Sequence, residues 1–215
     1  MPNLGQWLWY LLQEPGCPAS FKEPAFDVVL VQAFGRNHLH DNDLANMRRF
    51  HDEHGGNDAH TLAWCRDHVE PGVPNRILAW HLMNIMHHHE VLAFAQWEVV
   101  AACPADWYAA HHHRVVCLWP PATPGQYFST RDVLEKSFAE MRPRGRSRPL
   151  ILAHAGQAMR VAMMIRKMTD RWPAVWVDLP DDFDRSSVQS WTRNRWAWMM
   201  HEFLARAHHI VHGWV

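Results

Sequence analysis

The stretch from Pro149 to Arg160, which reads P-L-I-L-A-H-A-G-Q-A-M-R, places polar side chains directly after an apolar run. Leu150 to Ala153 are apolar, and a second apolar pattern with the spacing of a helix follows the polar residues. This order is typical of a buried parallel strand that leads into a helix through a very short turn. Open α/β sheets bind ligands at the carboxyl ends of their strands. His154, Gln157 and Arg160 are therefore candidate site residues.

The chemistry that suits this turn is the binding of an anion. Backbone N–H groups and the helix dipole favour negative charge at a helix N-terminus. Arg160 would add a charged donor to a phosphate or carboxylate, Gly156 belongs to the same ligand-binding set, and His154 is a candidate catalytic residue. The same residues also fit a structural role, with His154 capping the helix and Arg160 pairing on the surface.

Two further polar segments are candidates for the same cleft. Gly35, Arg36 and Asn37 follow the first predicted strand, where the glycine permits a sharp turn that either binds an anion or simply ends the strand. Ser129, Thr130 and Arg131 precede a predicted helix, although Ser129 also fits a capping box with Asp132.

Three other polar residues follow the second and fifth predicted strands. Gln96 and Glu98 flank Trp97, and Glu98 in this apolar setting would have a raised pKa and act as a general acid or base. Glu98 equally fits a first-turn carboxylate that complements a helix dipole. Asp178 would hold a ribose hydroxyl or a cation, or lie in a solvated loop.

The histidine triplets at 87–89 and 111–113 do not have the spacing of a metal site. Three consecutive residues diverge around a helix or alternate along a strand, whereas metal ligands converge. We predict no metal ligands in this chain.

Short β-branched or apolar runs alternate with segments of helical period along most of the chain. This alternation predicts a parallel sheet with helices on both faces, a three-layer Rossmann-like α/β fold. The predicted strands are 26–33, 90–95, 114–119, 150–153 and 174–177, and the predicted helices are 41–54, 58–69, 75–88, 130–141 and 155–169. Residues 1–25 are predicted to form an irregular or helical extension, and residues 26–215 a single domain.

The C-terminal region predicts one more helix. Ser186 and Gln189 have the spacing of a helix cap. An apolar stripe follows and is expected to pack on the domain; it comprises Val188, Trp191, Trp198, Met199 and Phe203.

Composition limits the classes of function. The 215 residues carry a formal charge of −1, which argues against nucleic-acid binding as the main role. The four cysteines are widely spaced and suggest reduced thiols in the cytoplasm. No apolar run approaches the ~20 residues that a membrane span needs.

Three segments resemble the YdcF/SanA/ElyC-like family of bacterial α/β domains. They are D-V-V-L-V-Q-A-F-G-R at 27–36, S-T-R-D-V-L-E at 129–135 and L-I-L-A-H-A-G-Q-A-M-R at 150–160. His154 matches the family histidine and Arg160 the arginine after it. Where the family often has a Ser-Gly-Gly turn after its second strand, this chain has Gln96-Trp97-Glu98. The resemblance implies a nucleotide-like ligand, such as a nucleotide or S-adenosylmethionine.

Taken together, these features predict a domain that binds a small anionic or nucleotide-like molecule, and they identify no reaction. One alternative is a scaffold or interaction protein with a decayed site, because the family turn is missing and the chain has 13 tryptophans that could form a homo-oligomer interface. Another is a metal-handling protein rich in histidine, of which there are 18.

Overall fold

The computed structural model describes residues 26–35, 41–120, 128–176 and 181–214. The predicted N-terminal extension and the candidates Arg36, Asn37 and Asp178 lie outside these residues. The described strands are β1 (Val28–Val31), β2 (Leu92–Gln96), β3 (Val115–Leu118), β4 (Pro149–Leu152) and β5 (Ala174–Val175). The described α-helices are α2 (Asp41–Glu53), α3 (Asp58–His68), α4 (Val73–His88), α5 (Trp97–Ala102), α6 (Ala105–His111), α7 (Thr130–Met141), α8 (Ala155–Thr169) and α9 (Arg195–Val211).

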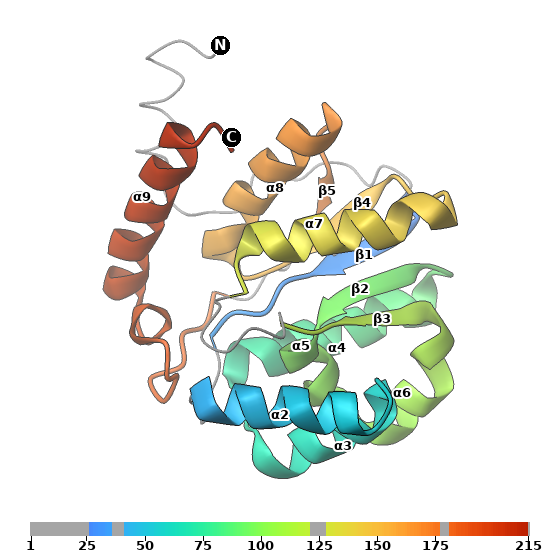
Figure 1. Cartoon of the computed structure of the whole chain (residues 1–215). Helices are drawn as coiled ribbons and strands as arrows, with labels where there is room; N and C mark the ends of the chain where they lie inside the picture. The colour runs from blue at the N-terminus through green and yellow to red at the C-terminus, as the bar shows by residue number, and fades with distance from the viewer. Residues whose placement is uncertain (1–25, 36–40, 121–127, 177–180, 215) are drawn as a thin grey trace.

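Within this part of the chain the strands form one parallel sheet in the order β3-β2-β1-β4-β5. Helices cover both of its faces (Figure 1), so the predicted three-layer Rossmann-like α/β fold is confirmed. β1 and β4 are buried along their whole length. Because helices cover both faces of the sheet, these strands consist of continuous apolar runs.

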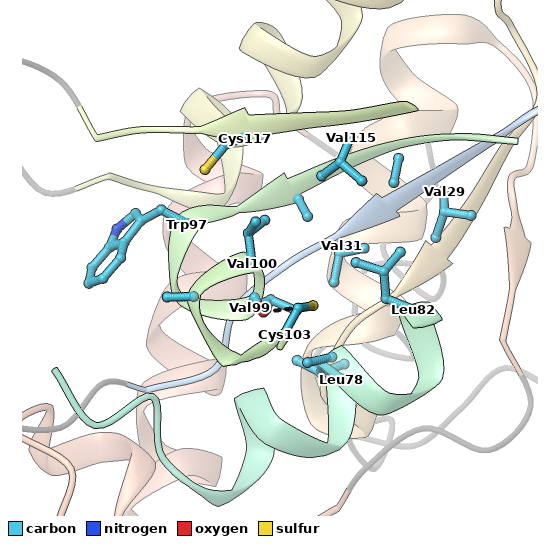
Figure 2. Packing of buried hydrophobic residues seen from close by; sticks show 14 of the residues in the cluster. Val29, Val31, Leu78, Leu82, Trp97, Val99, Val100, Cys103, Val115 and Cys117 are labelled. Carbon is cyan, nitrogen blue, oxygen red and sulfur yellow. Dashed lines mark hydrogen bonds between the residues drawn. The ribbon is translucent and has the colours of Figure 1, made fainter. Parts of the chain in front are cut away.

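Side chains of β1 alternate between two cores. Val29 and Val31 pack with α3, α4 and α5, and Figure 2 shows them beside Leu78 and Leu82 of α4. On the opposite face, Val28 and Leu30 pack with α7 and α8. The sheet is therefore the rigid layer between two helical layers.

The strand order creates a crevice between β1 and β4. The chain leaves β1 for the face that carries α4, whereas it leaves β4 for the face that carries α8. At such a reversal point the two connections diverge, and open α/β folds bind their ligands there. Figure 1 shows that α9 lies beside the carboxyl ends of the strands.

The start of the C-terminal helix differs from the prediction. Ser186 donates to Asp184 in a turn, and α9 begins at Arg195, where the Asn194 side chain accepts a hydrogen bond from the backbone N–H of Ala197. The predicted apolar stripe is confirmed at Trp198 and wrong at Phe203, for the same reason. The face of each residue was assigned by counting helical turns from Ser186, but the helix begins only at Arg195. As a result, Trp198 is buried and Phe203 is half exposed.

None of the described helices has the length and apolar character needed to cross a membrane.

Asn75 of α4 fixes the turn that follows β1. Its side-chain oxygen accepts from the Phe34 backbone N–H at 2.9 Å. Its side-chain nitrogen donates to the carbonyls of Gly35 at 2.9 Å and Pro71 at 2.7 Å. The side chain is fully buried, so these three bonds have no competition from water.

We predict that Asn75→Ala lowers the free energy of unfolding by about 2–4 kcal/mol, because three buried backbone groups lose their partner. Denaturation in urea measures this loss. Asn84→Ala, on the exposed side of the same helix, is the control and should change stability by less than about 0.5 kcal/mol. Equal effects of the two substitutions would contradict the role given to Asn75.

Candidate functional site

A cavity of about 420 Å³ lies at the carboxyl ends of β1 and β4. This volume suits a small organic molecule. The turn after β1, the first turn of α7, the start of α8 and the inner face of α9 surround it. Its lining consists of Ala33, Phe34, Gly35, Ser129, Thr130, Arg131, Gln157, Arg160, Gln189, Trp191, Thr192, Trp198, His201, Leu204, Ala205, His208, His209 and Trp214.

The cavity brings together six residues predicted from the sequence, which come from three separate segments. They are Gly35, Ser129, Thr130, Arg131, Gln157 and Arg160. The segments meet because their strands end at the same edge of the sheet.

Gly35 shapes the wall formed by the turn after β1. Its φ of +71° lies in the left-handed region, which favours glycine. A Cβ atom at this position would lie 2.8 Å from Thr192 Oγ1 and 3.1 Å from Ser187 Oγ. Glycine therefore allows the segment before α9 to approach the turn closely.

The first turn of α7 presents Thr130 and Arg131 to the cavity. Ser129 forms the predicted capping box: its hydroxyl accepts from the Asp132 backbone N–H at 3.2 Å, and the Asp132 carboxylate accepts from the Ser129 N–H at 2.9 Å. The Arg131 guanidinium lies over the Trp214 ring, 4.7 Å from its centroid, and pairs with Glu135. The cap thus holds one cationic side chain at the cavity wall.

His154 caps α8 from beneath the cavity and is not part of the lining. Its Nδ1 accepts from the Gly156 N–H at 3.2 Å, so Nε2 carries the proton and donates to the Asp182 carbonyl at 3.1 Å. The ring stacks on Phe34 with 3.6 Å between centroids. Burial lowers the pKa of His154 to about 3. His154 is therefore the cap of α8, as the structural interpretation of this residue expected, and both of its ring nitrogens are already hydrogen-bonded.

Arg160 connects three helices. Its Nη1 donates to Thr130 Oγ1 of α7 at 3.0 Å, and its Nε donates to the Glu202 carboxylate of α9 at 3.0 Å. Glu202 also accepts from Arg206 Nε at 3.1 Å. All four side chains are buried. The alternative of a surface ion pair for Arg160 is therefore excluded, because this guanidinium is buried at the cavity wall.

Trp198 of α9 fills the space above Gly156. A Cβ atom on Gly156 would lie 2.3 Å from Trp198 Nε1, so the absence of a side chain there admits the indole. Trp198 also packs edge-on against Phe34, with 4.7 Å between ring centroids. Gly156, predicted to contact a ligand, instead contacts this tryptophan.

Three side chains on the lining have buried polar atoms with no hydrogen-bond partner in the described structure. These atoms are Gln157 Oε1, Trp198 Nε1 and His209 Nδ1. A buried polar atom left unpaired costs about 1–3 kcal/mol. All three atoms are shielded from solvent, and Trp198 Nε1 faces Gly156, so they lie behind the cavity surface and not on it.

Burial and neighbouring positive charge lower the pKa values of two histidines that line the cavity. The pKa of His209 is lowered to about 3, first by burial and then by the neighbouring Arg160, His208 and His212. Burial and Arg160 also lower the pKa of His201. An anion bound in the cavity would offset the charge of Arg160 and so raise the pKa of both histidines.

Gln96 and Glu98 lie apart from this cavity. Gln96 Oε1 accepts from the Ala33 N–H at 2.8 Å and ties the end of β2 to the end of β1. Glu98 is buried on α5, on the other face of the sheet, near Cys65 and Cys117. Its negative charge adds to burial in raising the pKa of the Cys65 thiol to about 12.

Among the described residues, no group of three or more His, Cys, Asp or Glu side chains could hold a metal ion. His87 to His89 are exposed at the end of α4, and the triplet at 111–113 lies at the end of α6.

Comparison with protein-family models, curated proteins and solved structures finds no match to this chain. The resemblance to the YdcF-like family therefore stays a prediction.

Sequence reasoning missed the contribution of α9. Trp198, Glu202, Arg206 and His209 recur at intervals of three or four residues and form the buried face of the helix. The sequence shows this spacing. It was not used, because apolar residues were assumed to form the buried face of α9.

We predict that His154 makes stability depend on pH. The neutral ring is favoured in the folded state, so its contribution is complete above pH 6.5 and is lost as the pH falls toward 3. The loss should be about 1.4 kcal/mol per pH unit between pH 6 and 4. The His154→Gln amide can make both hydrogen bonds without titrating. The free energy of unfolding of this variant should therefore fall less steeply with decreasing pH than that of the parent, by about 1.4 kcal/mol per pH unit. Urea denaturation at several pH values measures both slopes, and identical slopes would refute the assignment.

Proposed function

We propose that this chain binds a small anionic molecule of nucleotide-like size in the crevice between β1 and β4. The observation that carries the proposal is the cavity of about 420 Å³ at the carboxyl ends of β1 and β4, whose lining includes Arg131 and Arg160. Two guanidinium groups from different helices favour a negatively charged ligand.

The anion is expected to lie at the N-terminal end of α7. Thr130 and Arg131 belong to the first turn of this 12-residue helix, and both line the cavity. Arg160 lies 3.0 Å from the Thr130 hydroxyl and supplies a guanidinium from α8. Phosphate and carboxylate are the groups that this combination recognises.

Aromatic side chains supply the rest of the lining. Trp191 stacks with His201 at 4.9 Å between ring centroids, and Trp214 lies nearby on the same lining. Such rings favour a planar ring in the ligand, as in a nucleotide. This is the basis for proposing a nucleotide or S-adenosylmethionine rather than a free inorganic ion.

The proposal concerns binding and assigns no reaction. We further propose a cytoplasmic location, supported by the buried free thiols of Cys65, Cys103 and Cys117.

We predict that AMP, and more weakly inorganic phosphate, raises the melting temperature of the protein, and that Arg131→Gln weakens AMP binding about 5- to 20-fold. Thermal shift detects binding, with S-adenosylmethionine as a further probe, and calorimetry gives Kd.

Arg144→Gln is the matched control, because Arg144 pairs with Glu140 four residues away just as Arg131 pairs with Glu135, but lies outside the cavity. It should bind AMP like the parent. If none of the three probes raises the melting temperature, or if both variants bind equally well, the proposal is wrong.

A further inference from the structure

The outward face of α9 is apolar along its whole length. Trp196 is 77% exposed, Met200 65%, Leu204 63% and Val211 80%, and Phe203 beside them is 45% exposed. Isolated apolar residues are common on protein surfaces, but a contiguous stripe of large ones marks an interface.

This face is unusual because the inward face of the same helix is polar. Glu202, Arg206 and His209 are buried against the domain, and Trp198 is the large apolar residue among them. A helix that only covered the crevice would turn its apolar side inward. The orientation of α9 therefore leaves its apolar side available for a second contact.

The spacing of the stripe identifies a second copy of the chain as the partner. With Ala207 included, the positions are 196, 200, 203, 204, 207 and 211, and the intervals between them read the same in both directions. In two copies of α9 that pair antiparallel about a two-fold axis, each of these positions faces another position of the same stripe, so the patch is self-complementary.

The side chains also complement one another in size across such an axis. Trp196 would face Val211, Met200 would face Ala207, and Phe203 would face Leu204, so each larger side chain meets a smaller one. Pairing of large with small residues lets two helices interdigitate closely.

The available area agrees with a weak dimer. The exposed apolar stripe offers on the order of 600 Å² per copy, against about 800 Å² per partner in a standard stable interface. An interface of this size is at the low end of specific association, where dissociation constants in the micromolar range are expected.

We propose that the outer face of α9 is a homodimer interface in which two copies of the helix pack antiparallel, with the two-fold axis between Phe203 and Leu204. Leu204 lies at the edge between this face and the crevice that it also lines, whereas the other stripe residues lie outside the lining. The inference stands independently of the ligand proposed above.

Sedimentation velocity of the full chain between about 1 and 200 μM tests the association. The parent should shift from monomer to dimer across this range, and Met200→Glu, at a stripe residue outside the cavity lining, should raise the dimer dissociation constant at least tenfold while leaving the melting temperature of the monomer unchanged. Trp80→Glu, an exposed residue of α4 (56%), is the control and should dimerise like the parent. A parent that stays monomeric at 200 μM, or a Met200→Glu variant that still dimerises, would overturn the proposal.

Cysteine cross-linking tests the antiparallel register. An equal mixture of Trp196→Cys and Val211→Cys should form a disulfide-linked dimer under mild oxidation, whereas each variant alone should match the background of the parent. A cross-link in Trp196→Cys alone, equal to that of the mixture, would indicate parallel helices and refute the register.

Discussion

The buried guanidinium of Arg160 holds together the end of the molecule that contains the cavity. It extends from α8 and bonds to Thr130 on α7 and to Glu202 on α9, and Glu202 in turn bonds to Arg206. Removing one partner from a buried ion pair typically costs 3–5 kcal/mol, because the remaining charge is left uncompensated. The position of α9 over the crevice therefore depends on a small number of charged contacts rather than on a wide apolar interface.

The contacts among Arg160, Glu202 and Arg206 determine which side of α9 faces the crevice and which side faces the solvent. A buried ion pair contributes little net stability compared with apolar packing of the same volume, so its presence suggests a role in geometry. Here it keeps polar groups around a cavity that apolar packing would close. Because polar residues occupy the inner side of α9, its apolar residues lie outside, where a second copy can cover them. The proposed binding site and the proposed interface are thus two consequences of one helix orientation.

The sequence predicted the sheet because each buried strand is a short apolar run that ends at a polar turn, as Leu150 to Ala153 do before His154. Parallel strands end at one edge, so residues such as Gly35, Thr130 and Arg160 could be placed at a common cleft before the structure was known. Strand order could not be predicted, because it depends on which helices pack together and not on any local pattern. The role of α9 was missed because the turn at Ser186 was taken for a helix cap, and because an apolar stripe normally marks the inner face of a helix.

The most direct test of the account is the pKa of His209 measured by histidine NMR with and without AMP. Burial and the charge of Arg160 keep the pKa of this ring at about 3 in the free protein. An anion bound beside Arg160 offsets the charge that acts on His209 and so stabilises the protonated ring, and by linkage the same proton favours the anion. Saturating AMP is therefore expected to raise the pKa of His209, and Arg160→Met, which leaves the Glu202–Arg206 pair in place, is expected to abolish this shift. A pKa of His209 that does not change when AMP binds would contradict the placement of the anion in this crevice.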